Sequence, residues 1–230
     1  MKKKTTGKTS KKNTKRSREK EINIIEGALK VFGEKGFEDT TISAISKAAK
    51  ISDATIYEYF SSKEEVLFSI PKLYTQREFD RLKNIGQFIH CPKERIRAII
   101  QAYLEFYEKN RLYTSVVMLS LKGSRNFLKS EAYQVIREAS RTIVDTFREG
   151  VAKEVFREDV DPYLFRNMLL GFIEHLTIQW LLVERPASIT ECRDQIFDMC
   201  MRAVLKETGQ TTLDLKCHTV NITITKNEET

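Results

Sequence analysis

One short segment of the chain concentrates small and hydroxyl-bearing side chains, with two tyrosines close behind them. Ser52 and Ala54 are small enough to let a helix approach base edges closely, and Thr55 can exchange a hydrogen bond with a base or touch a thymine methyl. Tyr57 and Tyr59 can offer hydroxyls to flanking phosphates, which would fix the register of such a helix. These residue types predict contact with double-stranded DNA, and the alternative for Tyr57 is half-buried packing.

Groups suited to phosphate contacts border this segment. Thr41 can present its hydroxyl and the amide of a helix start, and Lys63 adds a positive charge near the start of another helix. Lys15, Arg16 and Arg18 precede the first helix and could reach the DNA backbone or an adjacent minor groove. The alternative for Lys63 is a solvated surface lysine.

A second group of residues, aromatic and polar, lies in the larger C-terminal part of the chain. Such residues could line a pocket for a small apolar molecule. At helical spacing they more often form core, and His175 is more often a satisfied interior histidine, with Gln179 one turn later as its partner. The candidates for the wall of a ligand pocket are Tyr103, Phe106, Tyr107, Met118, Phe147, Phe172, His175 and Gln179.

Catalytic and metal-binding motifs are missing from the sequence. His90, His175 and His218 have no spacing typical of a metal site, and no glycine-rich phosphate loop or nucleophile elbow occurs. The four cysteines show no C-x-x-C spacing, which indicates reduced thiols. We therefore expect no enzyme activity, no metal and no cofactor.

Helices must position the DNA-facing side chains. Apolar residues at helical spacing predict a first helix over residues 17–34. A second, short helix follows a cap at Thr40 or Thr41, and a third begins at Ser52 or Asp53. Two short amphipathic helices joined by three or four residues are the sequence form of a helix-turn-helix.

Longer helices follow. Ser61 and Ser62 each stand three residues before a glutamate, so either could form a capping box, and Pro71 predicts a kink or a later start in a helix that ends near 84. Asp161 before Pro162 is a strong helix start signal. The remaining helical segments are predicted over 93–109, 111–121, 125–156, 161–184 and 188–207, and a strand-like alternation over 211–230 has no evident partner. The expected fold is all-α, with an N-terminal three-helix helix-turn-helix domain and a larger C-terminal helical domain.

Charge is distributed very unevenly along the chain. Residues 1–20 contain ten Lys or Arg and one acid, so the remaining residues carry a net charge of −2 although the whole chain carries +7. A basic arm without apolar periodicity is expected to be disordered and attracted to a polyanion, unless it is only a solubilising tail. The predicted divisions are a basic disordered arm over 1–16, the helix-turn-helix DNA-binding domain over 17–62, the larger helical domain over 63–208, and a tail over 209–230.

Membrane and secretory signals are missing too. No apolar run reaches the roughly 18–20 residues of a membrane span. The N-terminus lacks the apolar region of a secretory signal, so a cytoplasmic location and no membrane partner are expected.

Residues 32–67 read FGEKGFEDTTISAISKAAKISDATIYEYFSSKEEVL and closely resemble the DNA-binding domain of the tetracycline-repressor (TetR) family. The matching features are the aromatic after Gly36, the Thr-Thr pair, the run from Ile51 to Tyr57, Phe60, and Lys63 followed by two acids. The resemblance implies a third helix in the major groove, a homodimer on palindromic operator DNA, repression, and a small-molecule pocket in the C-terminal domain.

Two positions depart from the family pattern. Lys50 stands where the family usually has a glycine in the turn, and a left-handed backbone there would cost a non-glycine residue about 1 kcal/mol. Asp53 stands where a basic residue is common among relatives. An acid there either accepts from a cytosine amine or caps the helix, and we favour capping.

The last two long helical segments, 161–184 and 188–207, are the candidates for a dimeric four-helix bundle. The segment DPYLFRNMLLGFIEHLTIQWLLVERP, with the preceding FREGVAKEVFREDVD, resembles the acyl-CoA-responsive fatty-acid-degradation repressors of the family. This resemblance implies a small hydrophobic effector such as a long-chain acyl-CoA.

Two other functions compete with this interpretation. A helical small-molecule carrier without sequence-specific DNA binding would explain the large domain but leave residues 41–63 unexplained. A purely electrostatic binder of RNA or membranes would explain only the basic arm. We therefore expect a ligand-responsive regulator that binds operator DNA as a dimer.

Overall fold

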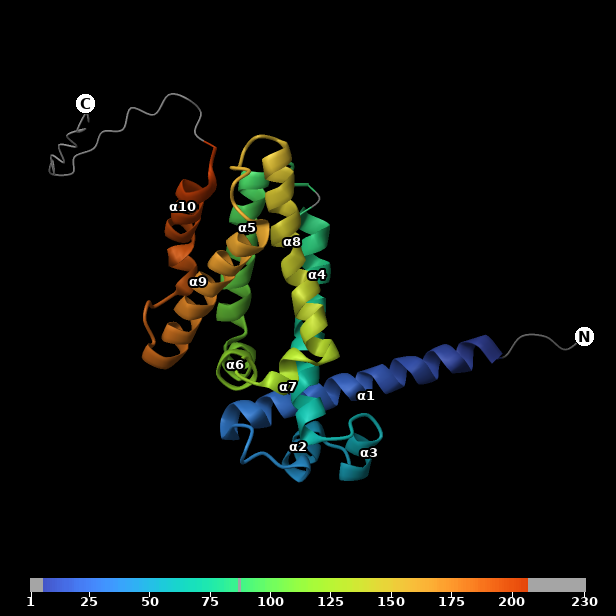
Figure 1. Ribbon diagram of the computed structural model, residues 1–230. Coiled ribbons are helices and arrows are strands. Elements are labelled where there is room, and N and C mark those ends of the chain that lie inside the picture. The colour runs from blue at the N-terminus through green and yellow to red at the C-terminus, as the bar shows by residue number, and fades with distance from the viewer. Residues whose placement is uncertain (1–5, 87, 207–230) are drawn as a thin grey trace, which may run out of the picture.

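The computed structural model describes residues 6–86 and 88–206, and this part of the chain is all-α, as predicted (Figure 1). Three helices form a small head: α1 (Thr6–Lys35), α2 (Ile42–Ala49) and α3 (Asp53–Tyr57). The predicted caps of the two short helices are confirmed. The Thr41 hydroxyl accepts from the amide of Ala44 at 3.1 Å, and the Ser52 hydroxyl accepts from the amide of Thr55 at 3.2 Å.

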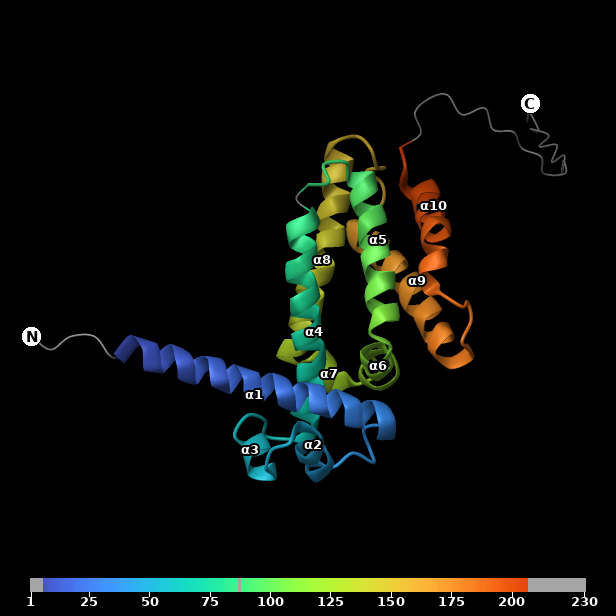
Figure 2. The same cartoon turned by 180° about the vertical axis from the view of Figure 1, so that it is seen from behind.

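The first helix is longer than predicted. α1 begins at Thr6, so residues 6–16 belong to a helix, and the disordered arm predicted over 1–16 is wrong for them. Figures 1 and 2 show this part of α1 projecting as a rod away from the rest of the molecule. The sequence of residues 6–16 has no apolar periodicity, so periodicity could not reveal this part of the helix. Lysine and arginine are nevertheless good helix formers.

The turn between α2 and α3 contains the two residues that depart from the family pattern, Lys50 and Asp53. The left-handed backbone considered for Lys50 is confirmed, and the capping role predicted for Asp53 is wrong. Lys50 takes the left-handed conformation that the glycine would favour, with φ 57° and ψ 45°. Asp53 does not cap α3, because Ser52 does so. Its carboxylate instead accepts a hydrogen bond from the Ser46 hydroxyl of α2, which joins the two helices directly.

The helix α4 (Lys63–Gly86) leads from the head into a larger helical body. Ser62 caps it by accepting from the amide of Glu65 at 3.1 Å, and the Glu65 carboxylate accepts from the Ser61 amide at 2.7 Å. The Ser61 hydroxyl also donates to this carboxylate at 2.6 Å, and the hydrogen bonds from the Ser61 hydroxyl and then from its amide lower the pKa of Glu65. Pro71 lies inside α4 and does not delay its start.

The body consists of α5 (Pro92–Lys109), α6 (Arg111–Ser115), a π-helical turn η1 (Val116–Leu121), α7 (Arg125–Leu128), α8 (Glu131–Ala152), α9 (Pro162–Val183), a 3₁₀ turn η2 (Ile189–Cys192) and α10 (Arg193–Val204). The segment predicted over 125–156 contains two helices. α7 ends at Leu128, and Ser130 caps the start of a new helix, α8. The start of α9 is as predicted, with the Asp161 carboxylate accepting from the amide of Leu164 at 2.7 Å.

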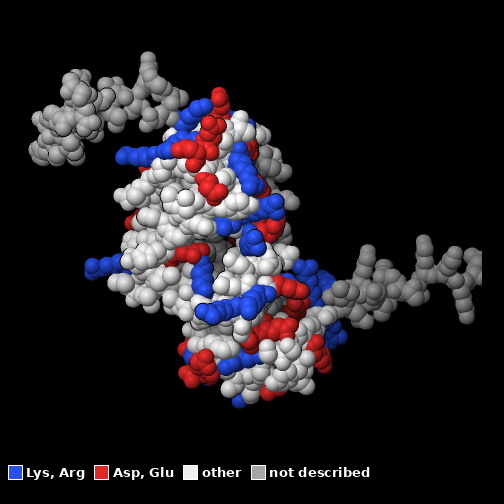
Figure 3. Space-filling view, viewed as in Figure 1, with Lys and Arg blue, Asp and Glu red and all other residues white. Residues whose placement is uncertain are grey.

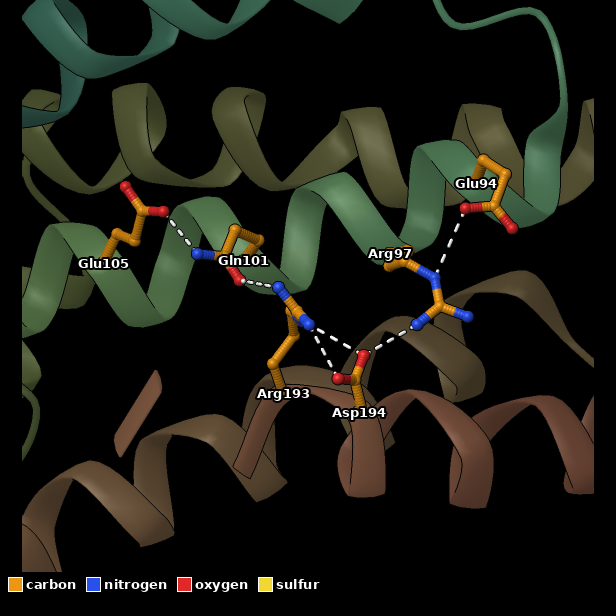
Figure 4. Close-up of polar contacts among 6 residues, drawn as sticks. All are labelled: Glu94, Arg97, Gln101, Glu105, Arg193 and Asp194. Atoms are coloured by element: carbon orange, nitrogen blue, oxygen red, sulfur yellow. Dashed lines mark hydrogen bonds and ion pairs between the residues drawn. The ribbon is translucent and has the colours of Figure 1, made fainter. Parts of the chain in front are cut away.

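Polar contacts fasten α10 to α5 along one side of the body (Figure 4). Arg97 pairs with Asp194 at 2.7 Å and its guanidinium lies 3.7 Å from the ring centroid of Phe197. Arg193, the first residue of α10, donates to Gln101 at 3.1 Å. Charged groups at the start of α10 therefore fix its position on α5, and Phe197 is buried beneath them.

The head meets the body in two places. α4 packs on both α1 and α8, and α1 also packs on α6. At the second contact, a Cβ on Gly33 would come within 2.1 Å of the Leu112 side chain, so glycine allows this close approach. A displacement of α4 or α6 would therefore shift α1, which is part of the head.

Among the residues that the structure describes, no helix is both long and apolar enough to cross a bilayer. The strand-like alternation predicted over 211–230 lies outside the described residues.

Candidate DNA interface and ligand cavity

The start of α3 is exposed, as a DNA-reading edge must be. Ser52 and Ala54 are exposed and Thr55 is half-buried. The hydroxyls of Ser52 and Thr55 lie 2.9 Å apart, so the two groups hold each other in place while each keeps hydrogen-bonding capacity. Ile56 on the opposite face is fully buried and anchors the helix in the head.

The two tyrosines have different surroundings. Tyr57 is 59% exposed, so it is not packed as the alternative supposed. Tyr59 is half-buried, and its hydroxyl lies 3.1 Å from the Ser17 hydroxyl of α1. This contact fixes the base of the projecting rod to the end of the helix-turn-helix.

A small hollow borders this contact, lined by Arg16, Ser17, Lys20 and Tyr59. Two cations and two hydroxyls are the groups that bind phosphate oxygens. Neither Arg16 nor Lys20 makes an ion pair with any residue that the structure describes. Lys15 and Arg18 are also exposed, and Figure 3 shows basic side chains gathered where α1 leaves the body.

Lys63 is neither solvated nor fully free to reach DNA. Its amine donates to the carbonyl of Phe37 at 2.7 Å and to that of Glu38 at 3.2 Å, and it lies 4.3 Å from the centroid of the Phe37 ring. An ammonium has three donors, so one remains for another acceptor. Thr41 is exposed and its hydroxyl can still donate.

The body contains a cavity of about 870 Å³, within the size range of small-molecule sites. Its wall combines apolar residues with hydroxyl and charged groups from α4, α5, α6, η1, α7, α8 and α9. The residues used below are Thr75, Glu78, Arg95, Ala102, Tyr103, Phe106, Tyr107, Tyr113, Lys122, Glu149, Leu170 and Glu174.

Three of the eight predicted pocket residues line this cavity: Tyr103, Phe106 and Tyr107. The other five do not line it. Met118 and Phe147 are buried in the core, where Phe147 stacks on Phe156 at 5.1 Å between ring centroids. Phe172, His175 and Gln179 lie on the outer face of α9, so His175 is not an interior histidine.

Charged residues of the wall were missed by the sequence analysis. Arg95 pairs with Glu149, and the pKa of Glu149 is lowered by hydrogen bonds from Lys153 and then from Arg95. Lys122 pairs with Glu174 of α9. On a helix, such residues have the spacing of an ordinary solvated face, so no sequence signal separates them from surface charges.

The outer face of α9 carries a stripe of exposed residues at intervals of three and four. This α9 stripe consists of Leu164, Met168, Phe172, His175, Gln179 and Leu182. Leu164 and Leu182 are each 65% exposed, and Met199 of α10 is exposed as well. Figure 3 shows a largely uncharged surface over this side of the molecule. Such a seam resembles one half of a helix–helix interface.

Comparison with known proteins agrees with this geometry. The model of the bacterial regulatory proteins of the tetR family matches residues 24–70, and that of the tetracyclin repressor-like C-terminal domain matches residues 90–204. The fatty acid metabolism regulator protein of Bacillus subtilis is 23% identical over 190 residues, which cover 83% of this chain and 98% of that protein.

Two solved structures have the same fold. The fatty acid degradation regulator FadR of Bacillus halodurans superposes with a TM-score of 0.74 at 24% identity, covering 79% of this chain and 94% of that one. FadR of Bacillus subtilis, solved in complex with stearoyl-CoA, has a TM-score of 0.74 at 22% identity, covering 78% of this chain and 97% of that one.

Proposed function

Because the chain belongs to the TetR family of DNA-binding transcriptional regulators, which are not enzymes, we propose that it represses transcription as a homodimer on palindromic operator DNA and is released by a long-chain acyl-CoA. The observation that carries the proposal is the combination of an exposed α3 edge with a separate cavity of about 870 Å³ in the body. The operator lies in the cytoplasm of a bacterial cell, which is where we expect the protein.

The head supports major-groove binding. α3 is short, capped and anchored by Ile56, so its leading edge of Ser52, Ala54 and Thr55 can enter the groove. Tyr57 would contact a phosphate beside the groove, and the hollow of Arg16 and Lys20 would hold another farther along the backbone. Thr41, Lys63, Lys15 and Arg18 complete the proposed backbone contacts.

The dimer is supported by the α9 stripe. Two copies of α9 and α10 packed around a two-fold axis would form a four-helix bundle and remove the exposed apolar side chains from water. The same axis would present two copies of α3 to successive grooves on one side of the duplex.

The acyl-CoA effector is supported by the cavity and by the Bacillus subtilis FadR that was solved with stearoyl-CoA. Apolar wall residues such as Phe106 and Leu170 suit an acyl chain. Entry of a chain would displace α4 or α6, and the contacts of these helices with α1 would carry that displacement to the head.

The proposal is tested by selecting genomic fragments that the full-length protein binds at moderate salt, then titrating stearoyl-CoA. We expect a palindromic site and its release by stearoyl-CoA at concentrations at which free coenzyme A has no effect. A carrier without DNA specificity would bind stearoyl-CoA but show no preference among fragments, and that result would contradict the proposal.

A further inference from the structure

Two tyrosine hydroxyls that line the cavity have no hydrogen-bond partner among the residues that the structure describes. Tyr103 and Tyr107 lie one turn apart on α5, their ring centroids are 5.9 Å apart, and Tyr107 is only 8% exposed. Neither hydroxyl forms a hydrogen bond with any residue that the structure describes. Buried polar groups in proteins are nearly always hydrogen-bonded, so this pair requires an explanation.

Both hydroxyls open into the cavity. No fully enclosed side-chain oxygen or nitrogen among the described residues lacks a partner, so unpartnered oxygens must face a space that water can enter. The space that both tyrosines line is the cavity. The nearby Tyr113 differs, because its hydroxyl is hydrogen-bonded to Thr75 of α4.

The two hydroxyls are donors at every physiological pH. Burial raises the pKa of both tyrosines far above the ordinary value, and Glu174 adds to the rise for each. A protonated phenol that points at a ligand can donate its hydrogen to an oxygen of that ligand.

The surroundings favour an uncharged oxygen over an anion. The Glu174 carboxylate disfavours negative charge at both tyrosines, and the cation that pairs with it, Lys122, is already engaged. Arg166 also lines the cavity and favours negative charge at Tyr103, but its effect there is smaller than that of Glu174. Ala102 and Phe106, which flank the tyrosines along α5, are apolar. A neutral acceptor on an otherwise apolar molecule therefore fits this part of the wall.

We propose that the effector of this protein carries an uncharged oxygen, a ketone or a hydroxyl, within its apolar body, where it accepts hydrogen bonds from Tyr103 and Tyr107. The inference rests on the proposed function only in taking the cavity to be the effector site. Such an effector differs from an unsubstituted acyl chain, because that chain would expel water from the two hydroxyls and leave them unpaired.

The test measures binding of matched probes to the full-length protein by calorimetry. One pair is stearoyl-CoA and the same ester with a mid-chain ketone, and the other is cholestene and cholestenone. We expect the oxygenated member of at least one pair to bind about ten-fold more tightly or better, because an unpaired buried donor weakens binding by roughly this factor.

The Tyr103→Phe/Tyr107→Phe double variant should reduce that preference to near unity, because the oxygenated probe loses its donors and the unsubstituted probe no longer buries unpaired hydroxyls. Binding of the unsubstituted probe should therefore stay the same or become tighter. Tyr163→Phe is the matched control, because Tyr163 is exposed on α9 and does not line the cavity. Thermal unfolding without ligand verifies that the double variant folds.

The outcomes separate the two proposals. Equal binding within both pairs, or a preference that survives in the double variant, would overturn the inference, while release of the operator by stearoyl-CoA would still support the acyl-CoA effector. A preference for cholestenone with no binding of either ester would refute the acyl-CoA effector and support the inference. Failure of all four probes would contradict both.

Discussion

Thr55 and Tyr57, two residues apart on α3, are expected to contribute to DNA binding in different ways. Tyr57 is strongly exposed and suited to a phosphate, so Tyr57→Phe should weaken binding of all duplexes several-fold, in line with the loss of about 1 kcal/mol for one hydrogen bond. Thr55 faces the bases in the proposed complex, and Thr55→Ala should change the order of preference among duplexes. Competition binding with a randomised operator measures both, and an equal loss on every sequence would refute base reading by Thr55.

The lowered pKa of Glu149, a residue of the cavity wall, makes the free energy of unfolding depend on pH in the acid range. Hydrogen bonds from Lys153 and Arg95 favour the ionised form in the folded state. The resulting stabilisation is present above the pKa of the unfolded chain, about 4.3, and is lost as the pH falls through the lower folded value.

Glu149→Gln should therefore lower the free energy of unfolding near neutral pH, and the difference from the original protein should shrink as the pH falls below about 4. Urea unfolding at a series of pH values measures this. Glu138→Gln, at an exposed position of the same helix, should show little difference at any pH. A difference for Glu149→Gln that grows in acid would contradict the assignment.

Among the helices, α8 is locked at its C-terminal end by a close contact. A Cβ on Gly150 would come within 2.1 Å of the ring of Phe156, which is fully buried and stacked on Phe147. Gly150→Ala should lower the free energy of unfolding by about 1–3 kcal/mol, because the ring cannot move without disturbing the core. Gly123→Ala, where nothing lies within 4 Å, is the control for thermal unfolding.

Helix starts were predictable because their signals are local. The side chains of Thr41, Ser52 and Asp161 cap the helices that their positions in the sequence indicated. The environment of each face of a helix was not predictable in the same way. Leu170 lines the cavity, whereas Phe172 lies on the outer surface, and the sequence of α9 is apolar on both sides. Periodicity states that a face is covered, but not whether core, ligand or a second copy covers it.

On the surface of the whole molecule, the α9 stripe exposes apolar side chains to water, and we expect a second copy to cover it. Met168→Glu/Phe172→Glu should convert the dimer to a monomer, because charges facing each other across the axis would repel and lose water. Light scattering after size-exclusion chromatography measures this. Phe88→Glu is the control, since Phe88 is 74% exposed but lies outside the stripe. A double variant that remains dimeric would place the interface elsewhere.

The basic rod of α1 adds a contact outside the groove-binding edge. If the hollow at Arg16 and Lys20 holds one phosphate, Arg16→Ala/Lys20→Ala should reduce the salt slope of DNA binding by about 0.9 without changing sequence preference. Fluorescence anisotropy at several salt concentrations measures the slope. An unchanged slope would mean that these cations lie away from the DNA.

The exposed seam of α9 also sets how the regulator responds to its own abundance. A single copy carries one α3 and can hold only half of a palindrome. If two copies join at the seam by non-covalent contacts, the concentration of dimer rises with the square of the copy number as long as most copies are single. A modest change in expression would then produce a disproportionate change in promoter occupancy.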